Sequence, residues 1–471
     1  MTDDEPQEPG NSGREFRDAA APHPSHPPHS LVLCGARLVD GRTVDVRLVA
    51  DRIEAVGTAG SLGPAQDCGT RVDLSGYLLL PAPAEPHAHY DTALTADPPP
   101  EPTGRDSHHA QGAHGSHNGH DAPPVRSTAR GRSTAGGRGA GQGRDTDACG
   151  EDVQRRTTEA ALLQLGQGAT ALRTHVHIGG VAGLRSLEAV LQARRSLRGL
   201  VDLSAVAVPR LLTGAGGAEE LAMLRDALKM GASAVGGCPD LDPDPGGYVE
   251  AVLEVAAEHG CHVDLHTDGS DPARLTRLAS AAGGLRPGVS IGPCAGLARL
   301  PHQVALRTAD QLAAAGVTVV CLPQGNCGML ERPSPASPSR VAPARVLAAA
   351  GVAVAAGSGA LRDAANQVGR GDPLEAAYLL ASHGEARPES AYDAVSTRAR
   401  AAMGLPEVRV EAGFPAELLA VRGSRLAGAL SLAYSRIVVH RGRVVARTSA
   451  VREYCDLAAA PELGLPRQSQ G

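Results

Sequence analysis

Three features that would assign the chain to a class at once are missing. No uninterrupted apolar run approaches about 18 residues, so no membrane-spanning helix is expected. The nine cysteines contain no Cys-x-x-Cys pair, and no secretory signal is recognisable, which predicts free thiols in a reducing cytoplasm. The formal net charge of −6 gives no reason to expect binding to nucleic acid.

The ends of the chain differ in composition from the rest. Residues 1–30 are acidic, polar and rich in proline, which predicts a disordered N-terminal tail, and residues 451–471 are expected to form a C-terminal tail. Between them the chain is long enough to bury a large core.

Two stretches near the ends alternate apolar and polar residues. LVLCGARLVDGRTVDVRLVADRIEAVG begins at Leu31, and AELLAVRG and SRIVVHRGRVVA follow late in the chain. Such alternation with turn residues is typical of short antiparallel strands. We expect residues 31–80 and 405–450 to form one small β-sandwich-like domain.

Residues 81–404 have a different rhythm, with short apolar runs separated by stretches of helical spacing. Apart from one long gap, eight such runs recur at intervals of roughly 30 residues, and this number and spacing predict a (β/α)8 TIM barrel. The runs are LLLPAPAEPH, ATALRTHV, VDLSAVAV, ASAVGG, CHVDLH, GVSIG, VTVVCL and VAVAAG. A doubly wound open sheet is the alternative, and the lack of a Gly-rich phosphate loop after any run argues against it.

The long gap interrupts the first unit. Residues 97–150 are rich in Gly, Ser, Arg and His, a composition that cannot bury enough apolar surface to order itself, and we expect a disordered insertion. Its histidines are expected to be solvated rather than part of a built metal site; they are His108, His109, His114, His117 and His120.

The motif EPHAHYD, residues 85–91, ends the first apolar run. His87 and His89 lie one residue apart, and side chains two apart on a strand point to the same side. Two imidazoles aimed at one point are the arrangement that a metal ion needs.

EPHAHYDTAL, together with RTHVHI, VAVP, LHTDGSD and the β segments at both ends, resembles the amidohydrolase superfamily and, within it, the cytosine deaminase-like branch. The resemblance implies a (β/α)8 barrel that binds a divalent metal, Zn or Fe. That metal activates water to attack a C–N centre of a cyclic amidine or amide. The family's metal ligands match His87, His89 and His266, and three histidines can hold Zn²⁺ with a position open for water.

Other positions depart from the family pattern. The proton-shuttling glutamate falls on Gly269, the eighth-strand aspartate on Gly359, the sixth-strand histidine on Gly292 or Pro293, and the glutamine that reads the pyrimidine on Arg210. Losing a positioned acid–base group typically slows a reaction by roughly 10²–10⁴-fold. A buried cation at Arg210 would favour an anionic substrate.

Three side chains could substitute for the missing groups, namely Asp268, Asp363 and His177. Asp268 is the candidate catalytic residue, with a helix cap as its alternative, and Asp363 lies in helix-like sequence where solvent exposure is the alternative. His175 and His177 alternate in phase, so both could face the barrel interior, and a structural core histidine is the alternative for each.

Two function classes follow from these residues. The first is a metal-dependent hydrolase with a rearranged site that acts on a small, anionic molecule. The second is a catalytically inactive relative that keeps the barrel for ligand binding or assembly. In both cases we expect a homo-oligomer.

Overall fold

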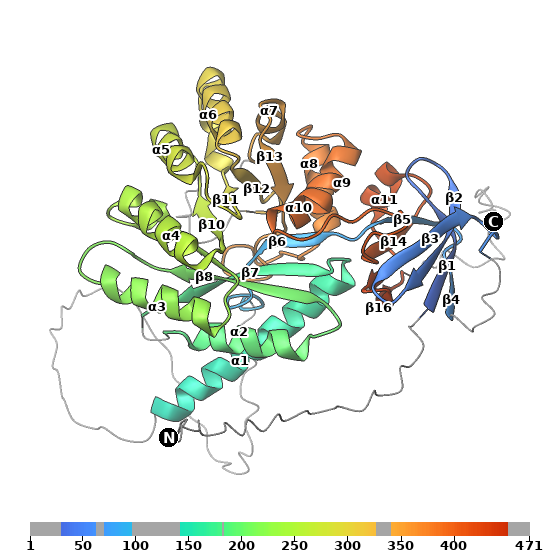
Figure 1. Ribbon diagram of the computed structural model, residues 1–471, viewed down its shortest axis with the longest axis horizontal. Helices are drawn as coiled ribbons and strands as arrows, with labels where there is room; N and C mark the ends of the chain where they lie inside the picture. The colour runs from blue at the N-terminus through green and yellow to red at the C-terminus, as the bar shows by residue number, and fades with distance from the viewer. Residues whose placement is uncertain (1–29, 63–69, 97–141, 181–182, 326–340, 451–471) are drawn as a thin grey trace, which may run out of the picture.

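A computed structural model describes residues 30–62, 70–96, 142–180, 183–325 and 341–450 (Figure 1). A barrel with its surrounding helices forms the larger part, and a separate β-sheet lies beside it. The expected tails and residues 97–141 of the expected insertion, with all five of its histidines, lie outside the described residues.

Eight parallel strands form the barrel sheet, and each pairs with the next in sequence order. They are β6 (Ala84–Ala88), β7 (Ala171–Ile178), β8 (Asp202–Pro209), β9 (Ala234–Gly237), β10 (His262–Thr267), β11 (Val289–Pro293), β12 (Thr318–Cys321) and β13 (Ala353–Ala356). A parallel bridge between Ala88 and Gly359 joins the two edges. The predicted (β/α)8 barrel is confirmed, and its strands coincide with the eight apolar runs.

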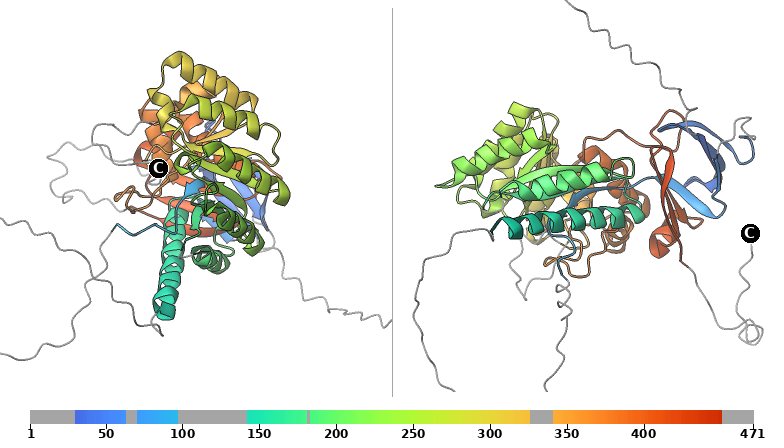
Figure 2. Two further views of the ribbon diagram at one scale, coloured as in Figure 1. Left: turned by 90° about the vertical axis from the view of Figure 1, so that its left-hand side faces the viewer. Right: turned by 90° about the horizontal axis from the view of Figure 1, so that it is seen from below.

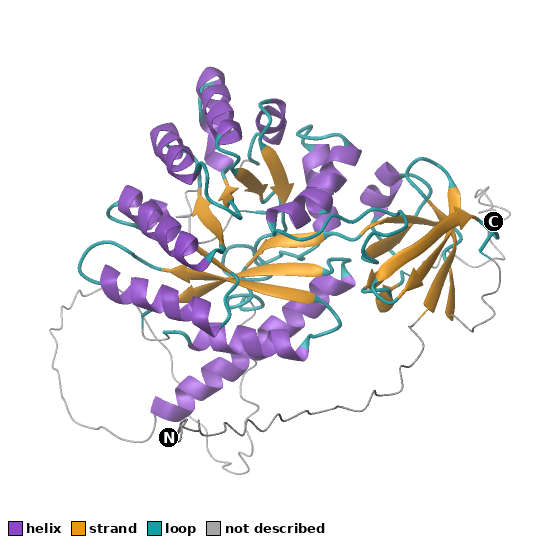
Figure 3. Ribbon diagram, viewed as in Figure 1, coloured by secondary structure: helices purple, strands orange, loops and turns teal. Residues whose placement is uncertain are grey.

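Helices pack around the outside of this sheet (Figure 3). They are α1 (Gln142–Gly166), α2 (Arg185–Ser196), α3 (Gly217–Met230), α4 (Pro245–His259), α5 (Pro272–Ala282), α6 (His302–Ala314), α7 (Ala344–Ala349), α8 (Pro373–Ser382), α9 (Pro388–Val395) and α10 (Thr397–Ala402). Asp244 and Asp271 cap α4 and α5 by accepting hydrogen bonds from backbone N–H groups.

Helix α1 projects beyond its neighbours (Figure 2). It begins at Gln142, so the expectation of disorder as far as residue 150 is wrong.

The second sheet combines both ends of the described chain. Its strands are β1 (Ser30–Arg37), β2 (Thr43–Val49), β3 (Arg52–Thr58), β4 (Thr70–Asp73) and β5 (Tyr77–Pro81) with β14 (Leu418–Arg422), β15 (Arg436–His440) and β16 (Arg443–Thr448). Strand β5 pairs with β14, which joins the two halves into one sheet with its own apolar core. The prediction that both segments build one β domain is confirmed. A short helix, α11 (Leu426–Leu432), follows β14.

Two expectations about the whole chain can be compared with the described part. In that part, Cys34, Cys261, Cys294 and Cys321 are free thiols. No helix in the described ranges combines the length and the apolar character of a membrane span.

A buried ion pair connects the second sheet to the barrel. The Arg436 guanidinium on β15 donates to both carboxylate oxygens of Asp372, at 2.8 and 2.6 Å, and both side chains are almost fully buried. Asp372 also caps α8 by accepting from the backbone N–H of Leu374 at 2.9 Å. One carboxylate therefore orients the last barrel helices and neutralises a cation from the other sheet.

We expect Asp372→Ala to lower the unfolding free energy by about 3–5 kcal/mol, because Arg436 would be left buried without its counter-charge. Denaturant unfolding measures this loss. Glu258→Ala is the control, since Glu258 forms a similar pair with Arg225 at 2.8 Å on the surface, and such pairs contribute at most about 1 kcal/mol. Equal losses in the two variants would contradict the role assigned to Asp372.

Candidate metal centre

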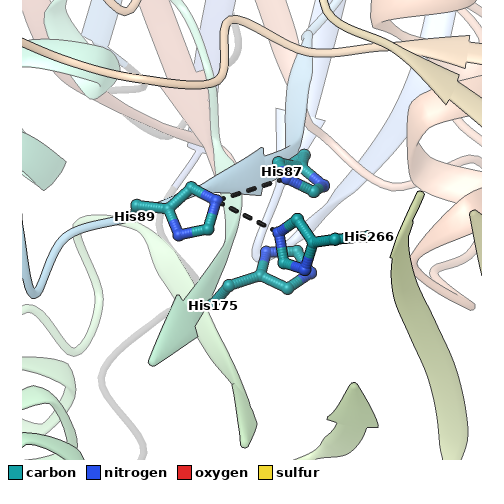
Figure 4. A group of neighbouring side chains, drawn as sticks. All are labelled: His87, His89, His175 and His266. Carbon is teal, nitrogen blue, oxygen red and sulfur yellow. Dashed lines mark hydrogen bonds between the residues drawn. The ribbon is translucent and has the colours of Figure 1, made fainter. Parts of the chain in front are cut away.

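Four histidines carried by β6, β7 and β10 or the residue just after β6 converge at the carboxyl ends of the strands (Figure 4). They are His87 on β6, His89 directly after it, His175 on β7 and His266 on β10. Each offers one ring nitrogen, and these nitrogens all lie within 4.8 Å of one another. The geometry brings together the three histidines expected to bind metal and adds His175.

The ring nitrogens are close and incompletely satisfied. His89 Nε2 lies 3.3 Å from His87 Nε2 and 3.2 Å from His266 Nε2. Within the described residues, the Nδ1 atoms of His87, His175 and His266 lack a hydrogen-bond partner. The close approach of the three Nε2 atoms fits a cation held between them.

The protonation state of the cluster also suits a metal ion. Burial, followed by the neighbouring imidazoles, lowers the pKa of His87 and of His266 well below the usual value. Burial and then His175 lower the pKa of His89 to about 3. These imidazoles are therefore neutral near pH 7, which is the form that binds metal.

Glu85 lies at the base of this cluster and was missed from the sequence. Its carboxylate accepts from the backbone N–H of His87 at 3.0 Å and of Ser358 at 2.8 Å. Burial raises its pKa to about 7, against hydrogen bonds from Ser358 and His87 that lower it. Glu85 therefore fixes β6 against the segment after β13. Residues 85, 87 and 89 share one strand phase, and that signal could have identified it.

The positions where acid–base groups were expected carry none. Gly269 and Gly359 are glycines with φ of +74° and +72°. Gly292 and Pro293 end β11 and offer no side-chain hydrogen-bonding group. Among the described residues, the metal-competent group consists of histidines alone.

A histidine–carboxylate pair lies beside the cluster. His177 Nδ1 is 2.7 Å from Asp91 Oδ2, and the backbone N–H of His177 donates to the same oxygen at 3.0 Å. The rings of His177 and His89 are 6.2 Å apart, and the His177 side chain is 40% exposed. Burial lowers the pKa of His177, but the hydrogen bond and charge of Asp91 outweigh it and raise the pKa overall. Asp91 is the last residue of the EPHAHYD motif, and no role was predicted for it from the sequence.

The family model for the amidohydrolase family matches residues 140–446, which is more than half of the chain. The chain belongs to the amidohydrolase family. The resemblance to this family that the sequence motifs indicated is confirmed.

Individual relatives of this amidohydrolase are deaminases and amidohydrolases. The chain is 30% identical over 321 residues to a pterin deaminase of Rhizobium rhizogenes, covering 65% of this chain and 72% of the relative. It is 26% identical over 242 residues to N-isopropylammelide isopropyl amidohydrolase of Pseudomonas sp., covering 50% of this chain and about half, 52%, of that protein.

Solved structures agree on the fold of this amidohydrolase. N-isopropylammelide isopropylaminohydrolase from Burkholderia multivorans superposes with a TM-score of 0.70 at 26% identity, covering 90% of this chain and 100% of that one. For 5-methylcytosine deaminase from Klebsiella pneumoniae the TM-score is 0.67 at 20% identity, covering 91% and 100% of the two chains. The second likeness concerns the fold alone.

Asp268, the expected catalytic residue of this amidohydrolase, is held by other groups. Its carboxylate pairs with Arg299, and its backbone N–H donates to Asp240 Oδ2 at 3.1 Å. It does not cap the following helix, because Asp271 fills that place. The alternative of a helix cap is therefore wrong, and Asp268 lies outside the histidine group.

Two further expectations about single residues are wrong. Asp363 is buried in a turn, where it accepts from the backbone N–H groups of Ala365 and Asn366 at 2.8 and 3.1 Å; it is neither helical nor solvated. Arg210, directly after β8, is exposed and not a buried cation. Exposure leaves its charge hydrated, which removes the argument that burial alone demands an anionic partner.

The depressed histidine pKa values predict how stability depends on pH. Below about 6.5 the unfolded chain binds protons on these histidines and the folded chain does not, so the unfolding free energy falls as the pH falls. In metal-stripped protein, His266→Gln should reduce this slope by roughly 1 kcal/mol per pH unit between about pH 6 and pH 5.

Urea unfolding at several pH values measures the slope. The raised pKa of Glu85 acts in the opposite direction, but it is common to both proteins and cancels in the comparison. Identical slopes for the two proteins would show that the His266 imidazole is not held neutral.

Proposed function

We propose that this member of the amidohydrolase family is a metal-dependent hydrolase that acts on a C–N bond of a small cyclic amidine or amide. The observation that carries the proposal is the group of buried histidines with ring nitrogens within 4.8 Å of one another. The names of the relatives, a pterin deaminase and an isopropyl amidohydrolase, support a reaction at a C–N bond.

His87, His89 and His266 would hold one divalent ion, Zn or Fe, because neutral imidazole suits both metals. A bound ion of this kind lowers the pKa of a coordinated water to about 7. The barrel contributes by excluding solvent, since His87 and His266 are fully buried and His89 nearly so.

His177 is the side chain that we assign to proton handling. Asp91 Oδ2 fixes Nδ1 at 2.7 Å, so Nε2 is the nitrogen through which His177 would exchange a proton with the substrate. The ring lies next to His89 and is partly open to solvent, as a group that meets a substrate must be. Asp268 could transfer a proton to or from the substrate only if its ion pair with Arg299 were broken.

Arg210 would contact an anionic substituent of the substrate. It lies directly after β8 and is exposed, and the active sites of TIM barrels are built from the loops at this end of the strands. We infer that it contributes to binding rather than to the chemical step.

A non-catalytic role is the second candidate. The observation that favours it is that Gly269 and Gly359 stand where the family places a glutamate and an aspartate. Each loss removes roughly 10²–10⁴-fold in rate unless another group replaces it. In this case the barrel would bind a small molecule without turning it over.

Metal analysis with a substrate panel separates the two functions. We expect protein purified without a His tag, with the histidines of residues 97–141 replaced, to retain about one divalent ion per chain. It should hydrolyse a cyclic amidine or amide and leave cytosine almost untouched. His266→Ala should lose both the metal and the turnover.

His262→Ala is the matched control, because His262 lies on the same strand but bonds Ser290 at 2.6 Å, outside the histidine group. Bound metal without turnover of any tested ring would favour the non-catalytic role. Protein that binds no divalent metal would refute the metal site itself.

If His177 handles the proton, His177→Gln should lower kcat by roughly 10²–10⁴-fold while the metal content stays unchanged. Asp268→Asn, made in parallel, should have a much smaller effect. Steady-state kinetics together with metal analysis test this assignment, and the reverse order of the two effects would transfer the role to Asp268.

A further inference from the structure

We propose that His175 is a fourth protein ligand of the metal, so that imidazoles alone complete the site from which the family's eighth-strand aspartate is missing. The inference rests on the metal site of the proposed function and not on catalysis. It changes the charge of the site, because three histidines and an aspartate would carry one negative charge and four neutral histidines carry none.

The position of His175 is that of a ligand. It is fully buried on β7, and its ring centroid lies 4.1 Å from that of His87 and 4.6 Å from that of His266. Figure 4 shows its ring among the other three. Its Nδ1 has no hydrogen-bond partner among the described residues. A histidine kept only for packing would normally have its nitrogens satisfied.

The carboxylate of Asp264, on β10, orients the His175 ring. Asp264 Oδ1 lies 3.4 Å from His175 Nε2, and Asp264 Oδ2 accepts from Arg173 Nη1 at 3.0 Å. All three side chains are buried. Histidines that bind metals commonly direct their second nitrogen at a carboxylate, which fixes the tautomer. With Nε2 directed at Asp264, Nδ1 is the nitrogen left for the ion.

The end of the eighth barrel strand, β13, supplies no alternative metal ligand among the described residues. Gly359 follows β13 and forms the bridge to Ala88, so its backbone takes part in closing the barrel. No Asp, Glu or Cys of the described residues joins the group of possible ligands. The donor set is therefore four imidazoles, which suit Zn²⁺, Fe²⁺, Ni²⁺ or Cu²⁺, whereas Mg²⁺, Ca²⁺ and Mn²⁺ prefer oxygen donors.

Zinc titration with a competing chelator tests the role of His175. We expect His175→Ala to weaken Zn²⁺ binding by more than about 100-fold, beyond the 10–100-fold typical of an outer-shell partner. Asp264→Asn should fall within that 10–100-fold range, and His262→Ala should leave the affinity unchanged. His175→Gln, which fills more of the core than alanine, replaces His175→Ala if the latter fails to fold.

X-ray absorption of the zinc-loaded wild-type protein counts its imidazole ligands without any variant. Four imidazoles would support the inference, and three with a water would overturn it. It would also fail if His175→Ala or His175→Gln bound zinc within about tenfold of the wild type while His266→Ala lost the metal; the proposed metal site would then stand. If wild-type protein bound no zinc, both the inference and the metal site would fall.

Discussion

Burial keeps the imidazoles of His87, His89 and His266 neutral, and the rest of the site depends on this constraint. Several charged rings at these distances would repel one another in a medium that screens little. The fold therefore brings together ring nitrogens whose lone pairs are available to bind a metal ion. The positions of those lone pairs are set by strand register, because each ring nitrogen is aimed by the strand that carries it.

The seam of the barrel maintains that register. Strand β6 carries His87 and meets the far edge of the sheet through Glu85 as well as through the bridge from Ala88 to Gly359. Gln164 on α1 donates to Ser358 Oγ at 2.9 Å and accepts a hydrogen bond from Tyr90. The network beneath the histidines is thus shared by the first strand, the first helix and the end of the last strand, and disturbing it would move the ligands.

The sequence predicts local periodicity well and long-range partners poorly. The eight strands and the side of β6 that holds His87 and His89 follow from apolar runs and a period of two. The same period marks Glu85 and Asp91, although only their partners explain what they do. The contact of Asp264 with His175 joins β10 to β7, which are not adjacent, and no local pattern contains it. The burial of Asp363 and the exposure of Arg210 likewise depend on neighbours that are distant in sequence.

The two glycines that replace the family's acidic residues are part of the packing. A Cβ at Gly269 would lie 3.2 Å from Leu297 Cγ, and one at Gly359 would lie 3.2 Å from Leu322 Cδ1; both positions also have positive φ. A side chain at either place would be strained and crowded. The surrounding residues have adapted to glycine, so one substitution would not simply return this site to the family pattern.

The composite sheet has a consequence for how the protein is made. Strand β5 finds its partner β14 only after the whole barrel segment has been synthesised, because β14 follows it in the chain. Until then the edge of β5 carries unpaired backbone groups, which are a template for unwanted pairing. Contacts between such distant segments also slow folding. During translation the first five strands are therefore the part of the nascent chain most in need of protection from aggregation. That exposure ends when β14 pairs with β5.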